Sequence, residues 1–599
     1  MGHRAAATPD PPAGPRGSSR TRLLVGLWPL LLAVLLLAPL LARTGYPLAR
    51  DLVFVPRQPF TDSSIGLGGT APRAVPLDAV VALATWLVDG AVLARVALLL
   101  ALVLAGWGVL RLTAPLGTWA RLAASGFAVW NPFVVERMAL GQWALVTAYA
   151  TMPWILLAAA RYRRTGERGA LASVVLWSAL ASLTPTGGLL ALATALAAGA
   201  SRSRRTWWLV GTGVLLQLPW LVPSLVGGVS TTADPAGVAV FAPGSDAAGS
   251  PALALLGLGG IWDGLSVPAT RHSPFAIAMA VFVVLVLVVG ARPWWRVAGD
   301  LAPRTAGLGL AGLLLALSLT TAPGQAALRW AIDSFPGLGL LRDGQKLVAP
   351  FVLLVAWVLA AAVDDLLTRL SRHGAEVMVS VGVLMVLLPV LLIPDGASKV
   401  WSTVRPVTYP PGLARVVDII DASPSGAGVV TLPWRSYRNF SWGSGTTSSD
   451  PLVRMVDRPV FTSDDLVVGD TTVRGESDVD AELGAALATG TPARVLPGLG
   501  IGWVVLYPDD PAARTLDLTG LEPVYAAPEV RLYAVPGASA APAPDGWRRL
   551  AVAVGDLLAL LTLLGAVAVG VLARRPRPGA RSRDDPVLES GHPPQEESC

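Results

Sequence analysis

Long apolar runs separated by short polar connections dominate the first two thirds of the chain. The first run is Leu23–Leu41, and eleven more follow at about 92–110, 118–130, 143–160, 170–184, 187–200, 206–226, 274–291, 305–320, 346–363, 376–393 and 550–573. A helix needs about 20 apolar residues to cross a hydrocarbon core. The pattern therefore predicts about twelve spans, several of them short. Leu23–Leu41 is longer than the apolar core of a secretory signal, which favours a retained anchor.

Arginines gather at every second connection between these runs. They lie within 111–121, 161–168, 202–205, 292–304, 369–372 and 574–581. Basic residues favour the cytoplasmic side of a membrane, so we expect both termini to be cytoplasmic. The long connections 43–76, 227–273, 321–345 and 394–546 are then external. The first of them contains four arginines, against the preference of basic residues for the cytoplasmic side. Either the preference is loose in this loop, or these arginines bind an anionic group.

The pattern changes character at residue 394, where the apolar runs shorten to the length of strands. Strand-like runs lie at Gly426–Leu432, Gly502–Tyr507 and Val530–Val535, and helical spacing lies at Pro411–Asp421 and Asp478–Leu487. Strands mixed with helices indicate a small α/β domain.

We therefore predict a mainly α polytopic membrane protein in five parts. They are a disordered cytoplasmic tail at 1–22, a transmembrane domain of about eleven spans at 23–393, an extracytoplasmic α/β domain at 394–546, a C-terminal transmembrane helix at 547–573 and a second disordered tail at 574–599.

Composition agrees with the membrane interpretation and excludes several functions. Of the 599 residues, 53% are hydrophobic and 14% are charged, against about 25% charged in soluble domains. The net charge of +6 follows the membrane topology and indicates no nucleic-acid partner. The single cysteine cannot form an internal disulfide, and the four histidines are too scattered for a metal site. No GxxxxGK phosphate loop occurs, which argues against an ATP-driven pump.

The first candidate for chemistry is Asp51, about ten residues after the first span. A carboxylate just above the membrane can deprotonate an acceptor hydroxyl or hold a divalent cation. The plainer alternative is a loop aspartate paired with Arg50 or Arg57.

The second candidate is the segment NPFVVERMALGQW at 131–143, an external turn between two spans. Pro132 ends the preceding helix. Glu136 could assist Asp51, and Arg137 could bind a phosphate. Alternatively, the two charges neutralise each other and anchor the turn.

The third candidate is GLGGIWDG at 257–264. Glycines let the backbone approach a ligand, Trp262 offers a face on which a sugar ring can stack, and Asp263 could be a second acidic ligand. The alternative is an interfacial or re-entrant segment with an anchoring tryptophan.

The fourth candidate is LLRDGQK at 340–346. Arg342 and Lys346 are four residues apart, so on a helix they would share one face. Two cations at the start of an external helix suit a lipid-linked phosphate. Alternatively, they pair with Asp343 or Asp333.

Together, these four segments resemble the GT-C superfamily of polytopic glycosyltransferases, above all the cell-wall arabinofuranosyltransferase-like membrane proteins of high-GC bacteria. The resemblance covers about residues 20–395. It implies a polyprenyl-phosphate sugar donor, an envelope glycan or lipid acceptor, and transfer on the outer face of a bacterial plasma membrane. It also implies that Asp51 is the base of an inverting reaction. Many members carry two adjacent acids at this position, whereas Asp51 stands between Arg50 and Leu52, which bears on metal dependence. A divalent cation is the one cofactor left open.

Two other functions fit the sequence. A transporter or flippase of lipid-linked envelope precursors would show broken spans, for which Thr184–Gly188 and Asp556 are the hints. A non-enzymatic assembly protein of the envelope would need nothing of Asp51.

Overall fold

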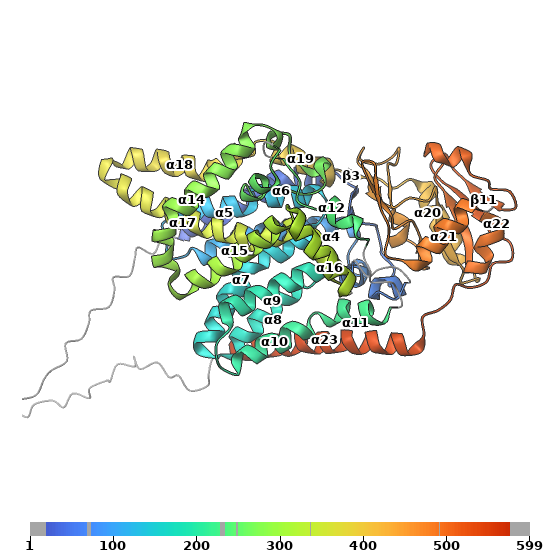
Figure 1. The fold of residues 1–599 in the computed structure, drawn as a ribbon, viewed down its shortest axis with the longest axis horizontal. Coiled ribbons are helices and arrows are strands. Elements are labelled where there is room, and N and C mark those ends of the chain that lie inside the picture. The colour runs from blue at the N-terminus through green and yellow to red at the C-terminus, as the bar shows by residue number, and fades with distance from the viewer. Residues whose placement is uncertain are drawn as a thin grey trace, which may run out of the picture.

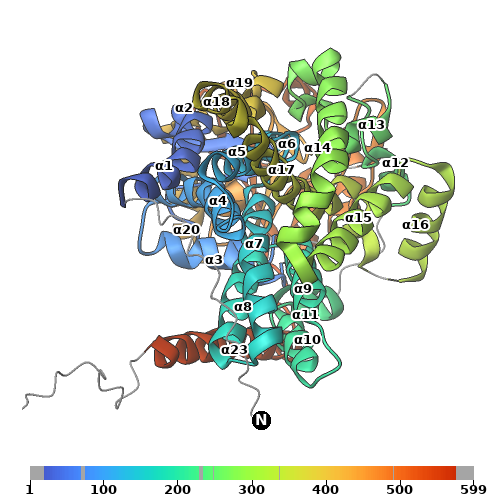
Figure 2. The same cartoon turned by 90° about the vertical axis from the view of Figure 1, so that its left-hand side faces the viewer.

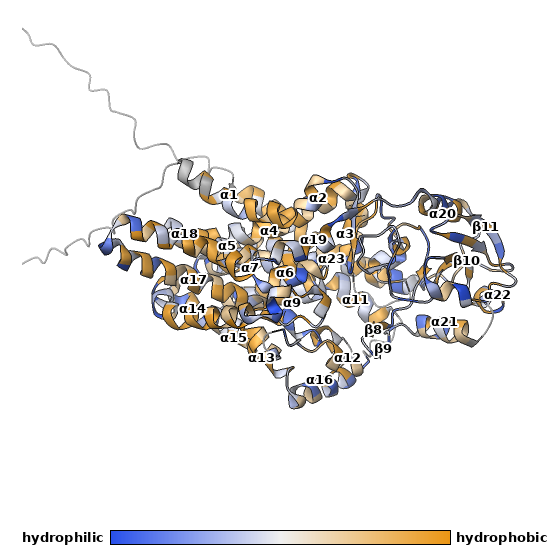
Figure 3. Ribbon diagram, turned by 90° about the horizontal axis from the view of Figure 1, so that it is seen from above, coloured by the Kyte–Doolittle hydropathy of each residue, from blue (hydrophilic) through white to orange (hydrophobic). Residues whose placement is uncertain are grey.

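The computed structural model describes residues 19–68, 74–227, 234–246, 249–335, 337–489 and 492–574. The tails predicted at 1–22 and 574–599 fall almost wholly outside these ranges, as does Arg73. Figure 1 shows a helical body with an α/β domain at one end. Figure 3 shows apolar residues concentrated on the helices of the body and polar residues concentrated in the α/β domain.

The long helices of the body pack around two central ones, α7 (Trp143–Thr165) and α17 (Ala349–Leu370), both largely buried by their neighbours. Figure 2 shows this arrangement end-on. The surrounding helices are α1 (Ser19–Leu36), α4 (Gly90–Leu112), α5 (Thr118–Val129), α8 (Arg168–Ala181), α9 (Pro185–Gly199), α14 (Pro274–Ala298), α15 (Ala302–Ser318) and α18 (Ala375–Leu392). The last helix, α23 (Gly546–Arg574), starts beside the α/β domain and runs back along α11, α10 and α8 (Figure 1).

Six stretches of the described residues are long and apolar enough to cross a membrane. A seventh results if α10 (Arg205–Leu215) and α11 (Leu218–Val226), bent by 57°, form one broken span. One of the six, Pro274–Ser318, contains both α14 and α15. The chain is therefore a multi-pass membrane protein, and the count of twelve spans with cytoplasmic termini stays a prediction.

Shorter helices connect the long ones or lie at the end of the body that faces the α/β domain. They are α2 (Ala38–Ala42), α3 (Leu77–Thr85), α6 (Pro132–Ala139), α12 (Ala236–Val240), α13 (Pro251–Leu256), α16 (Ala322–Ser334) and α19 (Gly396–Val404). Helix α6 occupies the segment that was expected to be a turn, and its start has a local cause. Pro132 takes the first helical position, and the Asn131 side chain accepts a hydrogen bond from the Val134 amide as its N-cap.

The α/β domain contains a five-stranded mixed sheet in the order β11-β12-β10-β4-β7. These strands are β4 (Gly428–Leu432), β7 (Val460–Phe461), β10 (Ile501–Leu506), β11 (Glu522–Ala526) and β12 (Arg531–Ala534). Strand β4 runs parallel to both β7 and β10, whereas β12 is antiparallel to its neighbours. The three predicted strands are confirmed as β4, β10 and β12.

Helices cover both faces of this sheet because successive side chains of a strand point to opposite sides. Val429 packs in one core with Val416 and Ile420 of α20 (Pro411–Ala422). Val430 packs in a second core with Leu483 of α21 (Asp478–Thr489), close to α22 (Pro492–Val495). Both predicted helices are thereby confirmed as α20 and α21.

The loop that follows α2 and the α/β domain are joined by small sheets. Strand β1 (Tyr46–Ala49) pairs with β2 (Leu52–Val53) on one side and with β3 (Pro406–Val407) on the other. Two hairpins complete the domain: β5 (Tyr437–Arg438) with β6 (Ser448–Ser449), and β8 (Leu466–Val468) with β9 (Thr471–Val473). Two segments more than 350 residues apart in sequence therefore meet at the base of the α/β domain.

Candidate functional site

Asp51 lies in the two-residue turn between β1 and β2. Its neighbour Arg50 has a φ of +55°, a left-handed conformation that is uncommon for residues other than glycine. Such strain costs on the order of 1–3 kcal/mol and persists only where the surroundings impose it. Here the Arg50 amide donates to the Thr447 carbonyl at 2.7 Å, and the Arg50 carbonyl accepts from the Ser449 amide at 3.1 Å.

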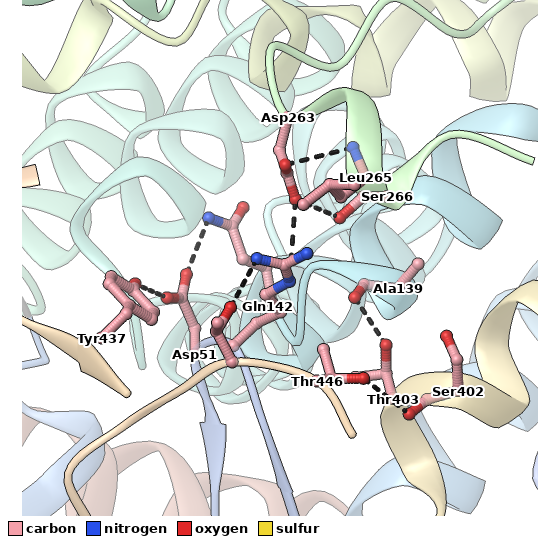
Figure 4. A network of polar contacts seen from close by, with 12 residues as sticks. Asp51, Ala139, Gln142, Asp263, Leu265, Ser266, Ser402, Thr403, Tyr437 and Thr446 are labelled. Carbon is pink, nitrogen blue, oxygen red and sulfur yellow. Dashed lines mark hydrogen bonds and ion pairs between the residues drawn. The ribbon is translucent and has the colours of Figure 1, made fainter. Parts of the chain in front are cut away.

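Both oxygens of the half-buried Asp51 carboxylate accept hydrogen bonds. The hydroxyl of Tyr437 donates to Oδ1, and Nε2 of Gln142 donates to Oδ2 at 3.2 Å. Both side chains point at the carboxylate from opposite sides in Figure 4. Asp51 does not pair with Arg50 or Arg57, the alternative partners. Arg50 contacts Thr447 and Asp263, and Arg57 stacks on Trp86.

Arg137 is wholly buried and organises the centre of the site. Its Nη1 and Nη2 atoms bind the two oxygens of Asp343 at 2.6 and 2.7 Å, a bidentate geometry that guanidinium favours. Its Nε donates to Gln345 at 2.6 Å, and Nη1 also donates to Gln142 at 2.7 Å. Burial raises the pKa of Asp343, but the Arg137 and Lys346 charges outweigh it and hold that pKa below its usual range.

Glu136 does not pair with Arg137, although the two are adjacent in sequence. Its Oε2 accepts from the Ile261 amide at 3.2 Å and from Gln345 at 3.1 Å, and its Oε1 lies 3.9 Å from Arg271 Nε. Burial, and then the carboxylate of Asp246, raises the pKa of Glu136 well above its usual range. Three side chains, Gln345, Arg137 and Gln142, separate Glu136 from Asp51 along the hydrogen-bonded chain.

The glycine-rich segment 257–264 brings Trp262 and Asp263 to this network. The Trp262 ring meets Phe241 edge-to-face, with centroids 4.8 Å apart. Asp263 accepts hydrogen bonds from the Leu265 amide at 3.2 Å and from the Ser266 hydroxyl at 2.7 Å, and it lies 3.9 Å from Arg50 (Figure 4). Asp263 therefore connects this segment to the turn that carries Asp51.

The two predicted cations reach the site, but not from one face of a helix. Lys346 lies in the 3-10 helix Gly344–Val348 before α17, and Arg342 lies just outside it, so the expected shared helical face is wrong. Asp343 precedes that short helix and separates the two residues, and its carboxylate binds Arg137. Lys346 Nζ lies 3.7 Å from Asp343, whereas Arg342 pairs with Glu476 at 2.9 Å and stacks on Phe241.

The structure thus gathers all seven predicted residues around one region between the helical body and the α/β domain. Asp343, the alternative partner expected for the two cations, does pair with Lys346. The sequence analysis missed five other partners: Gln142, Asp246, Arg271, Gln345 and Tyr437. Two of them, Gln142 and Gln345, stand inside the segments already singled out. The other three lie far from those segments or within unremarkable stretches, so no local pattern marks them.

Metal binding needs a cluster of ligands that the described residues do not supply. No group of three or more His, Cys, Asp or Glu side chains suited to a metal ion occurs in the described ranges. The donors around Asp51 are a tyrosine hydroxyl and an amide.

A side chain at Gly259 would force three buried charged side chains to move. An added Cβ would lie 2.5 Å from Arg271 Nη2, 2.6 Å from Asp246 Oδ2 and 2.7 Å from Glu136 Oε1. We expect Gly259→Ala to lower the free energy of unfolding by about 1–3 kcal/mol, as overpacking does. Thermal unfolding in detergent measures this.

Gly264→Ala is the matched control for that substitution, because nothing lies within 4 Å of the Cβ it would add. It should change stability by less than about 0.5 kcal/mol. Equal stability of the two variants would contradict the packing described around Gly259.

Comparison with known proteins adds the fold. No protein-family model and no curated protein matches the sequence. Among solved structures, arabinofuranosyltransferase AftD from mycobacteria superposes with a TM-score of 0.53 at 18% identity, over 87% of this chain and 40% of that one. The chain shares the fold of mycobacterial AftD. A mutant form of AftD gives a TM-score of 0.52, again at 18% identity, over 86% of this chain and 42% of that one.

The fold predicted from the resemblance to arabinofuranosyltransferase-like membrane proteins is therefore confirmed. This chain spans about two fifths of the length of AftD. At this identity the likeness concerns fold, and activity is a separate question.

Proposed function

We propose that this protein is a membrane glycosyltransferase. It moves a sugar from a polyprenyl-phosphate donor to an envelope glycan or lipid acceptor at the outer face of a bacterial plasma membrane. The observation that carries the proposal is the meeting of a hydrogen-bonded carboxylate, Asp51, with the cation Lys346 in one network. Arg342 lies four residues before Lys346, paired with Glu476. The Asp51 carboxylate is close enough to the Lys346 ammonium for the two charges to interact.

The accessibility of the cations distinguishes their roles. The Lys346 and Arg342 side chains keep 23% and 17% of their surfaces exposed, whereas Arg137 keeps none. Arg137 binds both oxygens of Asp343, which leaves Lys346 as the weaker and more exposed partner of that carboxylate. Lys346 and Arg342 are therefore the groups that a donor phosphate can reach, and Arg137 is the group that holds their surroundings in place.

The reaction follows from these positions. Asp51 takes the proton from an acceptor hydroxyl, whose oxygen forms the new bond to the anomeric carbon of the donor sugar. The bond from that carbon to the phosphate oxygen breaks, and its electron pair leaves with the phosphate. Lys346 and Arg342 stabilise the charge on that phosphate. A single displacement of this kind inverts the anomeric configuration. Trp262 offers a face for the sugar ring.

Donor binding tests this assignment directly. Purified protein is expected to bind a photoreactive polyprenyl-phosphate sugar saturably, and Arg342→Ala/Lys346→Ala to weaken binding at least tenfold. A lost charge-assisted contact costs about 1.5–3 kcal/mol. Arg369→Ala/Arg372→Ala, at the other end of α17, is the matched control and should bind like wild type. Folded wild-type protein that binds no donor would contradict the proposal.

A further inference from the structure

We infer that the α/β domain is a constituent of the catalytic site, in which Tyr437 is a positioning residue for Asp51. The inference rests on the function proposed above and deepens it. Asp51 belongs to the first external loop of the helical body, and Tyr437 belongs to the α/β domain, 386 residues later. A domain that only captured glycan at a distance would have no reason to contact the base.

The α/β domain holds the backbone beside Asp51 in place. The left-handed Arg50 is held on both sides by the segment leading into β6, through the Thr447 carbonyl and the Ser449 amide. The Arg50 side chain adds a 2.8 Å hydrogen bond from Nη1 to the Thr447 hydroxyl. Because a strained turn keeps its shape only where contacts impose it, the α/β domain determines the conformation of the turn that presents Asp51.

The Asp51 carboxylate is bound by both parts of the protein. Each oxygen of Asp51 has one donor, Gln142 from the helical body and Tyr437 from the α/β domain. These two bonds fix the plane of the carboxylate and leave further lone pairs for an acceptor hydroxyl. The orientation of the base therefore depends on how the two parts of the protein dock.

The segment that carries Tyr437 is attached to the α/β domain by several buried hydrogen bonds. Tyr437 and Ser449 are register partners in the β5–β6 hairpin, so one unit contacts both the side chain of Asp51 and the backbone of Arg50. The neighbouring Arg438 is buried and binds Asp450 at 3.0 Å and the Thr431 hydroxyl at 2.8 Å. Tyr507 donates to the same Asp450 at 2.8 Å. These bonds fasten the hairpin to the carboxyl ends of β4 and β10.

Removal of one hydroxyl tests the inference. Tyr437→Phe is expected to lower kcat for sugar transfer roughly 10- to 100-fold, because a small misplacement of a catalytic group has effects of that size. The KM for donor, donor binding and the unfolding temperature should stay at wild-type values. Tyr525→Phe on the edge strand β11 is the matched control and should keep wild-type kcat.

A double variant separates positioning from general structure. If Tyr437 acts through the carboxylate, Tyr437→Phe should cost nothing further in an Asp51→Asn background. Full additivity of the two losses, or unchanged kcat in Tyr437→Phe beside an active wild type, would overturn this inference alone. Absence of transfer by folded wild-type protein would instead overturn the proposed function.

Discussion

Asp51→Asn is expected to reduce sugar transfer by roughly 10²- to 10⁴-fold, the usual contribution of a general base. Asparagine has the same shape, and its oxygen can still accept the Tyr437 hydroxyl, although its amide nitrogen cannot accept from Gln142. The backbone bonds of Arg50 hold the turn, so the turn and the donor site should persist. Donor binding is therefore expected to remain within about twofold of wild type. The measurement is the initial rate of transfer from a radiolabelled polyprenyl-phosphate sugar, with donor binding determined on the same preparation.

Asp62→Asn provides the control for this substitution. Asp62 is an acid of the same loop between α2 and α3, and it pairs with Arg549 at 2.7 Å on the surface. The Asp62→Asn substitution should leave the rate of transfer unchanged. If Asp51→Asn transfers sugar as fast as Asp62→Asn, Asp51 is not the base. The proposed chemistry would then need another carboxylate.

Arg137→Met is expected to lower the free energy of unfolding by about 3–5 kcal/mol, because it leaves the buried Asp343 carboxylate without its bidentate partner. Methionine matches much of the arginine volume, so the loss reflects charge and hydrogen bonding. Thermal unfolding in detergent reports the change. Arg137→Met/Asp343→Leu removes both charges and should recover a substantial part of the loss.

Arg161→Met is the control for the buried pair. Arg161 forms a 2.6 Å ion pair with Glu167, but 63% of its side chain is exposed. Solvent screens such a pair, whose loss costs about 0–1 kcal/mol. Equal unfolding temperatures for Arg137→Met and Arg161→Met would show that Arg137 is not the centre of the site described here.

These two substitutions separate chemistry from architecture in one network. Asp51 is half-buried, with both oxygens held by neutral donors, so its replacement should affect rate. Arg137 is fully buried and its guanidinium donates to three side chains, so its replacement should mainly lower stability. Any effect on the rate of transfer should follow from that loss of stability. The role of Glu136 follows the second pattern. Glu136 is fully buried, and its carboxylate accepts hydrogen bonds from the Ile261 amide and Gln345, so its replacement should also affect stability first.

The sequence by itself determined the membrane class, three strands and two helices of the α/β domain, and four segments whose residues the structure brings together. Each of these depends on local information: the length of apolar runs, the period of hydrophobic positions, and charges placed outside spans. Membrane helices and buried strands are favoured by their own residues in nearly any context. For that reason β4, β10, β12, α20 and α21 agree with the pattern that predicts them.

Only the tertiary structure decided which charges meet. Adjacent residues on a short helix point in different directions, so Glu136 and Arg137 separate toward Arg271 and Asp343. Arg342 and Lys346 were expected on one helical face, but the 3-10 helix that contains Lys346 begins only after Asp343, so Arg342 lies outside it. The partner of Asp51 that completes the site, Tyr437, comes from a domain 386 residues away. A contact of this kind depends on how two folded parts dock, and neither hydrophobic period nor residue spacing encodes that locally.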